Sequence, residues 1–132
     1  MREPVFLSGA DIYFIHQQEI EISGGNPGIR DEDGIQACAD APKASFEGKL
    51  LYDLFGMAAT YLTCLTMRHP FIDGNKRTAL ASALTFLYLN GFFVEETYEE
   101  ELADLVLRFI AKKISKEEII EYFRASSKKL QG

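Results

Sequence analysis

The stretch "LLYDLFGMAATYLTCLTMRHPFIDGNKRTALASALTFLYLNG", residues 50–91, holds two apolar runs separated by a short polar connector. The first run, within residues 49–68, and the second, from about Asn75 to the stop signal at Gly91, are each predicted to form a helix. Both are apolar on nearly all sides, and a helix of that kind is buried among other helices. We therefore predict two central helices, with the connector, residues 68–79, between them.

Four capped or amphipathic segments outside this stretch predict further helices. The first begins after Ser8, the second starts at Asp31 or Asp33, the third covers residues 98–113, and the fourth runs from Ser115 to about Phe123. Residues 92–96 are predicted to be a short extended segment or a docking tail. Residues 42–48 are predicted to form a loop or small hairpin, and the tail, residues 126–132, to fray. The expected fold class is all-α, a bundle of about six helices in one domain spanning residues 1–132.

Composition restricts the classes of function. The chain has 132 residues, of which 47% are apolar and 26% charged, as in ordinary globular domains. The net charge is −6 and the pI is about 4.9, so the surface repels a phosphate backbone and binding to nucleic acid is not expected. The apolar run at residues 50–67 contains Asp53 and Gly56 and is too short to predict a membrane span.

No signal peptide is visible at the start of the chain, so a cytoplasmic location is expected. Cys38 and Cys64 are too few for a disulfide framework, and we predict two reduced thiols. Neither cysteine lies near a histidine at metal-ligand spacing, and the chain has no H-E-x-x-H sequence, so no zinc site is predicted.

The connector has the residues of an anion-binding turn. Pro70 disfavours helix at His69, so the first helix should end there. Gly74 and Asn75 readily adopt turn or left-handed conformations. The second helix then begins with unpaired backbone N–H groups that point into the loop, where an anion can bind. No P-loop sequence is present, so this site differs from that of the P-loop enzymes.

Four further residues of the connector have side chains that suit a site for phosphate chemistry. Lys76 and Arg77 lie in the first helical turn, where the helix dipole disfavours cations unless an anion binds there too. Asp73 offers a ligand for Mg²⁺, which commonly combines one carboxylate with phosphate oxygens. His69 is the group that can take a proton near neutral pH. The set predicts transfer of a phosphate-containing group to a hydroxyl, with Phe71 anchoring the loop in the core.

Each residue also has a plain structural interpretation. His69 alone is compatible with a helix C-cap, Asp73 and Gly74 with an ordinary turn, and Lys76 with Arg77 as a surface pair. The combination of all of them within nine residues favours a functional site. The other histidine, His16, has no charged cluster around it in the sequence, and a structural or surface role is expected.

Residues 69–77, "HPFIDGNKR", resemble the signature of the Fic/Doc (Fido) family, H-x-F-x-[D/E]-[G/A]-N-[G/K]-R. The upstream segment "GGNPGIRDEDGIQACADAP", residues 24–42, and "NKRTAL", residues 75–80, are similar to death-on-curing (Doc-type) members. The resemblance covers about residues 8–124. It implies a bundle of about six helices in which the motif lies between two central ones.

The resemblance also implies roles for the residues that match the motif. It makes His69 the catalytic base, Phe71 the buried anchor, Asp73 the Mg²⁺ ligand, Gly74 and Asn75 the anion-binding turn, and Arg77 the phosphate-binding arginine. The phosphate-binding role of Lys76 comes from its place in the first helical turn and not from the resemblance. ATP and Mg²⁺ are the implied substrate and cofactor. The loop at residues 42–48 occupies the position at which the family has a flap that aligns the target.

Two positions separate the branches of the family. Lys76 and Leu80 stand where Fic-type AMP-transferases have glycine and arginine, and this pattern is similar to the Doc branch. It implies a toxin that transfers the γ-phosphate of ATP to a Ser/Thr hydroxyl of a translation-related protein. The alternatives are an AMP-transferase on the same scaffold and a non-catalytic module that binds a nucleotide or a partner.

Restraint by a built-in inhibitory helix is not predicted. The family's inhibitory sequence is [S/T]-x-x-x-E-[G/N], and the pair Glu47-Gly48 has Lys43 at the required spacing instead of serine or threonine. A Doc-type toxin without this helix implies a separate antitoxin, which binds in a groove beside the site.

Overall fold

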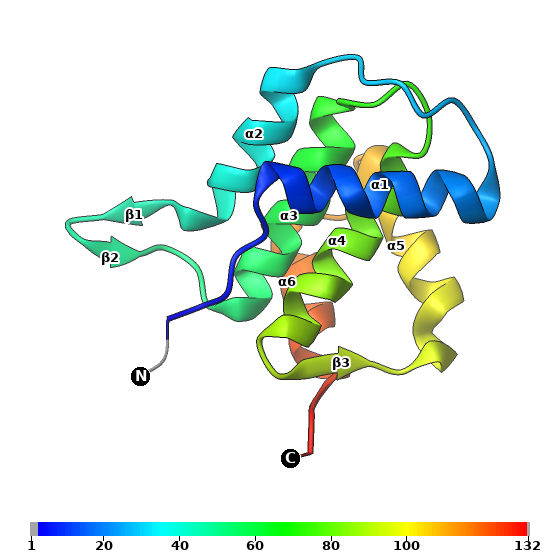
Figure 1. Cartoon of the computed structure of the whole chain (residues 1–132). Helices are drawn as coiled ribbons and strands as arrows, with labels where there is room; N and C mark the ends of the chain where they lie inside the picture. Colours follow the sequence, from blue (N-terminus) through cyan, green and yellow to red (C-terminus); the bar gives the residue numbers. More distant parts are fainter. Residues whose placement is uncertain (1–2, 132) are drawn as a thin grey trace.

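The computed structural model describes residues 3–131, in which six α-helices form a bundle (Figure 1). The expected all-α class is confirmed. The helices are α1 (Gly9–Ser23), α2 (Glu32–Asp40), α3 (Leu54–Arg68), α4 (Asn75–Leu89), α5 (Glu99–Ile110) and α6 (Lys116–Ser126), with 3₁₀ turns η1 (Ala41–Lys43) and η2 (Glu96–Tyr98). The strands β1 (Ser45–Phe46) and β2 (Lys49–Leu50) form one antiparallel pair, and β3 (Phe92–Val94) and β4 (Ser127–Lys129) form another.

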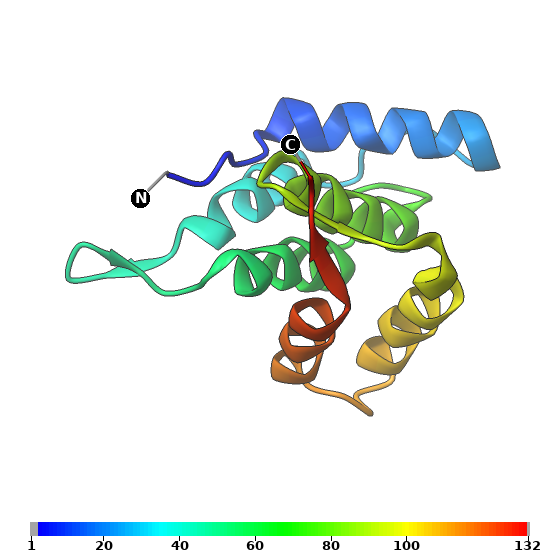
Figure 2. The same cartoon turned by 90° about the horizontal axis from the view of Figure 1, so that it is seen from below.

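The helices α3 and α4 are the central pair. Tyr61 of α3 and Phe86 of α4 are fully buried, with ring centroids 5.2 Å apart. Helix α1 lies on one side of the pair, and α5 and α6 lie on the other (Figures 1 and 2). The Tyr61 hydroxyl accepts a hydrogen bond from the backbone N–H of Leu7, at 2.9 Å, and so ties the segment before α1 to the core. The enclosed pair holds both ends of the connector in place.

Helix α3 begins five residues later than the sequence predicted. Lys49 and Leu50 pair with β1, so they are not available to the helix. The carboxylate of Asp53 accepts a hydrogen bond from the backbone N–H of Gly56 at 2.8 Å, which is a normal helix N-cap. In the described part of the chain, no helix has the length and apolar character that crossing a membrane requires.

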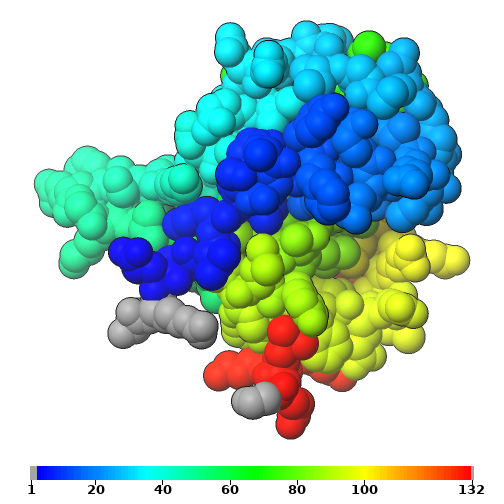
Figure 3. Space-filling model, in the orientation of Figure 1, coloured from blue at the N-terminus to red at the C-terminus, as the bar shows by residue number. Residues whose placement is uncertain are grey.

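The hairpin of β1 and β2 confirms the small hairpin expected near residues 42–48. It projects from the body of the molecule at the N-terminal end of α3 (Figures 1 and 3). The motif follows the other end of α3, and a 15-residue helix is about 22 Å long. The hairpin therefore does not cover the motif in this structure, and its role as a flap stays a prediction.

The C-terminal tail is more ordered than the sequence predicted. Ser127–Lys129 pair with Phe92–Val94, and the backbone N–H of Leu130 donates to the carbonyl of Gly91 at 2.8 Å. The expectation of a frayed tail over residues 126–132 is wrong for this part. The partner strand is more than thirty residues away in the chain, so local composition carried no sign of the pairing.

The expectation of two reduced thiols is also wrong in this structure. Cys38 of α2 and Cys64 of α3 form a disulfide, with their Cα atoms 5.5 Å apart. The two residues are 26 positions apart, and the packing of α2 against α3 brings them together. That packing cannot be deduced from the spacing of two cysteines.

Candidate active site

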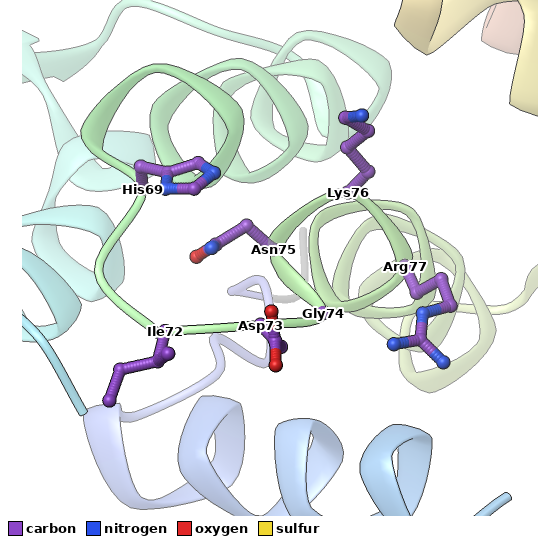
Figure 4. Close-up of a pocket in the computed structure, with 7 residues that line it drawn as sticks. All are labelled: His69, Ile72, Asp73, Gly74, Asn75, Lys76 and Arg77. Atoms are coloured by element: carbon purple, nitrogen blue, oxygen red, sulfur yellow. The ribbon is translucent and has the colours of Figure 1, made fainter. Parts of the chain in front are cut away.

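The candidate site lies where the C-terminal end of α3 meets the N-terminal end of α4. A cavity of about 300 Å³ opens there, and Figure 4 shows the side chains around it. Its lining residues are His69, Ile72, Asp73, Gly74, Asn75, Lys76 and Arg77. The structure thus brings together all the predicted site residues except Phe71, which lies beneath them.

His69 is the C-cap of α3 and is exposed, with φ 52° and ψ 54°. This left-handed conformation is uncommon for a residue other than glycine. The carbonyl oxygen of His69 accepts a hydrogen bond from Nε of Arg30 at 2.9 Å and a second one from Nη2 of the same residue. Nη2 of Arg30 also donates to the carbonyl of Arg68 at 3.1 Å. Arg30 therefore holds the end of α3 that presents the His69 ring.

Phe71 and Asn75 close the loop between the helices. The Asn75 side chain accepts a hydrogen bond from the N–H of Phe71 at 2.9 Å and donates one to its carbonyl at 2.8 Å. Phe71 is completely buried and Asn75 is only 4% exposed. The predicted anchor is thus in place. The Asn75 amide is occupied by the loop itself, which leaves its backbone N–H, at the start of α4, to face an anion.

The first turn of α4 carries no side-chain cap. Gly74 is its N-cap, with φ 79°, a left-handed conformation that suits glycine. The first N–H groups of a helix have no partner within it, so here they remain available to a ligand. Lys76 is exposed, and Arg77 donates to the carbonyl of Gly24 at 3.1 Å. In Figure 4 these two cations diverge from the first turn, on the side of the cavity away from Ile72.

Asp73 is exposed beside this turn. Its Oδ2 atom accepts a hydrogen bond from the backbone N–H of Asn26 at 2.7 Å. In Figure 4 Asp73 and His69 lie on opposite sides of Asn75. His69 and Asp73 therefore border the same cavity from two directions.

The loop between α1 and α2 supports the motif. Residues 24–31 run beside residues 70–72, and Ile29 and Phe71 form an antiparallel β-bridge. The N–H groups of Arg30 and Asp31 donate to the carbonyl of Pro70 at 2.8 and 2.9 Å. From the residues alone we expected only a turn at 23–28, and missed that this loop contacts the motif. A long-range backbone pairing of this kind leaves no local signal in one sequence.

His16 is buried beneath the motif, so the surface role that was one of its two expected roles is excluded. Its Nε2 atom lies 2.7 Å from the carbonyl oxygen of Asp73, and its ring stacks on Phe71 with centroids 3.7 Å apart. Burial lowers the pKa of His16, and the charge of Arg77 lowers it further, against the opposing effect of the Asp73 carbonyl. The ring is therefore neutral near pH 7, with Nε2 as the donor.

The comparisons with known proteins agree with this geometry. Residues 6–87, more than half of the chain, match the family model described as "Fic/DOC family". The chain is 36% identical over 118 residues to "Protein kinase doc" of Escherichia phage P1, which covers 89% of this chain and 92% of that protein. It is 35% identical over 89 residues to "Toxin Doc" of Mycolicibacterium smegmatis (strain ATCC 700084 / mc(2)155), which covers 67% of this chain and 68% of that protein.

Proposed function

Because this chain belongs to the Fic/Doc family of transferases, and to its death-on-curing type, we propose that it is a toxin with protein kinase activity. It transfers the γ-phosphate of ATP to a Ser/Thr hydroxyl of a translation-related protein and so arrests growth. The observation that carries this proposal is the cavity that His69, Asp73 and the uncapped start of α4 line together. Phosphoryl transfer depends mainly on positioning and charge neutralisation, which this arrangement can supply.

His69 acts as the general base in this proposal. The hydroxyl oxygen of the target attacks the γ-phosphorus, and the bond from that phosphorus to the oxygen bridging to the β-phosphate breaks. ADP leaves with the electron pair of that bond, and the hydroxyl proton passes to a nitrogen of His69. The exposed ring of His69 at the edge of the cavity allows a protein target to approach it.

The nucleotide phosphates bind at the first turn of α4. The backbone N–H groups that begin at Asn75, together with the cations of Lys76 and Arg77, place positive charge along one side of the cavity. This local field contrasts with the net charge of −6 of the whole chain. A bound phosphate removes the unfavourable contact between these cations and the positive end of the helix dipole.

Asp73 fits Mg²⁺ as the one protein carboxylate of its coordination shell. Within residues 3–131 no cluster of three or more His, Cys, Asp or Glu side chains could hold a metal by itself. Mg²⁺ commonly uses one or two carboxylates with phosphate oxygens and water, and the Asn26 bond occupies only one carboxylate oxygen of Asp73. When bound there, the ion would neutralise charge on the phosphates and orient them.

An AMP-transferase on the same scaffold is the second candidate. The Lys76 side chain occupies the cavity edge where AMP-transferases have glycine, and its bulk and charge favour presentation of the γ-phosphorus over the α-phosphorus. If Lys76 has this effect, the double variant Lys76→Gly, Leu80→Arg should transfer less phosphate than the wild type. Phosphate transfer at an unchanged rate would show that Lys76 and Leu80 do not determine the preference for the γ-phosphorus.

The proposed antitoxin site is a groove of about 570 Å³ between α1, α4 and α5. Ile22, Leu80 and Leu84 give it an apolar floor, and Glu19, Glu96 and Glu99 lie along it. Arg77 lines both this groove and the phosphate cavity. An amphipathic helix with basic flanks would match the groove in polarity and charge, and would reach the phosphate-binding arginine.

Expression in a bacterial host tests the proposed activity. We expect the wild-type chain to arrest growth and the His69→Ala variant to have no effect, because the base is gone while the exposed side chain leaves the fold intact. Circular dichroism and thermal unfolding of the purified variant check that it is folded. Equal arrest by the two proteins would support a non-catalytic binding module instead.

A further inference from the structure

His16 is joined to the motif although it lies outside it. It comes from α1, 57 residues before Asp73, and it is completely buried. A carbonyl oxygen can only accept a hydrogen bond, so the 2.7 Å contact requires the proton to be on Nε2 of His16. The Nδ1 atom then accepts from the side-chain amide of Gln17 at 3.1 Å. Both ring nitrogens are thereby satisfied in one tautomer.

The ring plane of His16 is fixed as well. It is nearly parallel to the ring of Phe71, with an interplanar angle of 6° and centroids 3.7 Å apart. A Cβ atom added at Gly74 would lie 3.1 Å from Ile20 and 3.6 Å from Cδ2 of His16, so α1 closes directly beneath the start of α4. The hydrogen bond to Asp73 is therefore directed by a side chain that has little freedom to turn.

We propose that His16 is a positioning residue for Asp73. Its Nε2–H fixes the Asp73 carbonyl from below, while the N–H of Asn26 fixes one oxygen of the carboxylate at 2.7 Å. Together they leave the other carboxylate oxygen directed at the nucleotide cavity, where it can bind Mg²⁺. The inference rests on the proposed role of Asp73. If it holds, α1 contributes to the site through His16 and does more than pack against α4.

The proposed role of His16 is comparable to that of the groups that hydrogen-bond to metal ligands in metalloproteins. Such groups orient the ligand, and their loss commonly lowers metal affinity or activity by about 10-fold to 100-fold. The same effect is expected here because the carbonyl held by His16 belongs to the residue whose side chain meets the metal. A packing residue, by contrast, would change stability without changing the dependence on Mg²⁺.

The test uses His16→Phe, which keeps an aromatic ring on Phe71 and removes the donor. Binding of a non-hydrolysable ATP analogue, adenosine β,γ-imidotriphosphate, is measured by calorimetry in a series of Mg²⁺ concentrations and in EDTA. We expect the half-saturating Mg²⁺ concentration to rise by about tenfold or more, with unchanged affinity in EDTA. His16→Gln retains an N–H donor and should stay close to the wild type. Gln18→Ala, an exposed change on the same helix, is the control.

A measurement on the wild-type chain does not depend on any variant folding. The Nε2–H proton of His16 should give a slowly exchanging, downfield resonance, since it is buried and hydrogen-bonded. We expect Mg²⁺ with the analogue to shift this resonance, and the analogue in EDTA to leave it in place. A resonance that responds equally to both would overturn the proposal.

The outcomes separate this inference from the proposed function. Wild-type affinity that is independent of Mg²⁺ would refute the metal role of Asp73, and with it the inference. Wild-type affinity that depends on Mg²⁺, with the same dependence in a folded His16→Phe variant, would refute the inference alone. A loss of affinity in the His16→Phe variant that is equal with Mg²⁺ and in EDTA would reduce His16 to a packing residue.

Discussion

His69 has a left-handed backbone conformation, which costs a non-glycine residue about 1–2 kcal/mol. The guanidinium of Arg30 makes hydrogen bonds to the carbonyls of His69 and Arg68, and these offset part of that cost. Arg30 is exposed, so it contributes to the site more than to the core. At the scale of single residues, the position of the proposed base therefore depends on a side chain outside the motif.

Replacing Arg30 by alanine should reduce catalysis without unfolding the protein. We expect kcat to fall by about 10-fold to 100-fold, because misplacing a catalytic group by about 1 Å has effects of that size. The KM for ATP should change little, since Arg30 does not line the phosphate cavity. Steady-state kinetics on a purified target measures both quantities.

The matched control for this change is Arg108→Ala. Arg108 is also exposed and also pairs with a neighbour, Asp104, but it lies on α5. Its replacement should leave kcat unchanged. Equal kinetics for the wild type and Arg30→Ala would show that the Arg30 contacts do not hold the site.

At the scale of elements, the N-terminal end of α3 links the central pair to α6. The Asp53 carboxylate caps α3 through Gly56 and pairs with Arg124 of α6 at 2.6 Å. Burial alone raises the pKa of Asp53, but the bonds from Arg124 and Gly56 outweigh it and lower that pKa overall. A carboxylate with a lowered pKa stabilises the fold above its unfolded pKa of 3.8, and this contribution is lost as the pH falls through the folded value.

Asp53→Asn should reveal this contribution in a pH-dependent way. Asparagine still caps a helix well, so the variant mainly loses the charge that faces Arg124. At pH 7 we expect it to be less stable than the wild type by up to about 1 kcal/mol, as is usual for a partly exposed ion pair. The difference should shrink below about pH 3.8, and urea unfolding at several pH values measures it. A difference that stays constant down to pH 2.5 would contradict the assignment.

Some of the elements could be predicted from the sequence and others could not. The two central helices and the connector followed from apolar pattern, Pro70 and Gly74, because these act locally. The start of α3 and the pairing of β4 did not, because each depends on a partner strand that composition does not specify. In the site, the motif residues were found from their chemistry, but Arg30 and Asn26 were missed. Each of these contacts has a backbone atom at one end: the guanidinium of Arg30 binds backbone carbonyls, and the backbone N–H of Asn26 binds Asp73. A backbone partner leaves no mark in the sequence, because every residue has one.

At the scale of the whole molecule, the bundle places an acidic groove next to a cationic cavity. Arg77 lines both, so a partner in the groove would act directly on the proposed nucleotide site. The disulfide between Cys38 and Cys64 lies apart from both and joins α2 to α3. Residues 24–31, which support the motif, lead directly into α2. The disulfide therefore fixes the C-terminal end of this loop to α3 through α2.

Reduction of this disulfide should lower the stability of the whole domain. A cross-link over a loop of this size commonly contributes about 2–4 kcal/mol, mainly by restricting the unfolded chain. We expect a reducing agent to lower the urea midpoint of the wild type by a corresponding amount. The Cys64→Ser variant should unfold at the same midpoint with or without the agent. A wild-type midpoint that does not respond to reduction would show that the link does not form in solution.

Isotopic labelling tests the central claim, γ-phosphate transfer with His69 as the base, most directly. The purified chain is incubated with proteins of a host extract and ATP labelled at either the α- or the γ-phosphorus, with Mg²⁺. We expect a target protein to acquire label from γ-labelled ATP, none from α-labelled ATP, and none with folded His69→Ala. Label acquired from α-labelled ATP would contradict the kinase assignment, and γ-label that persists with His69→Ala would contradict the role of the histidine.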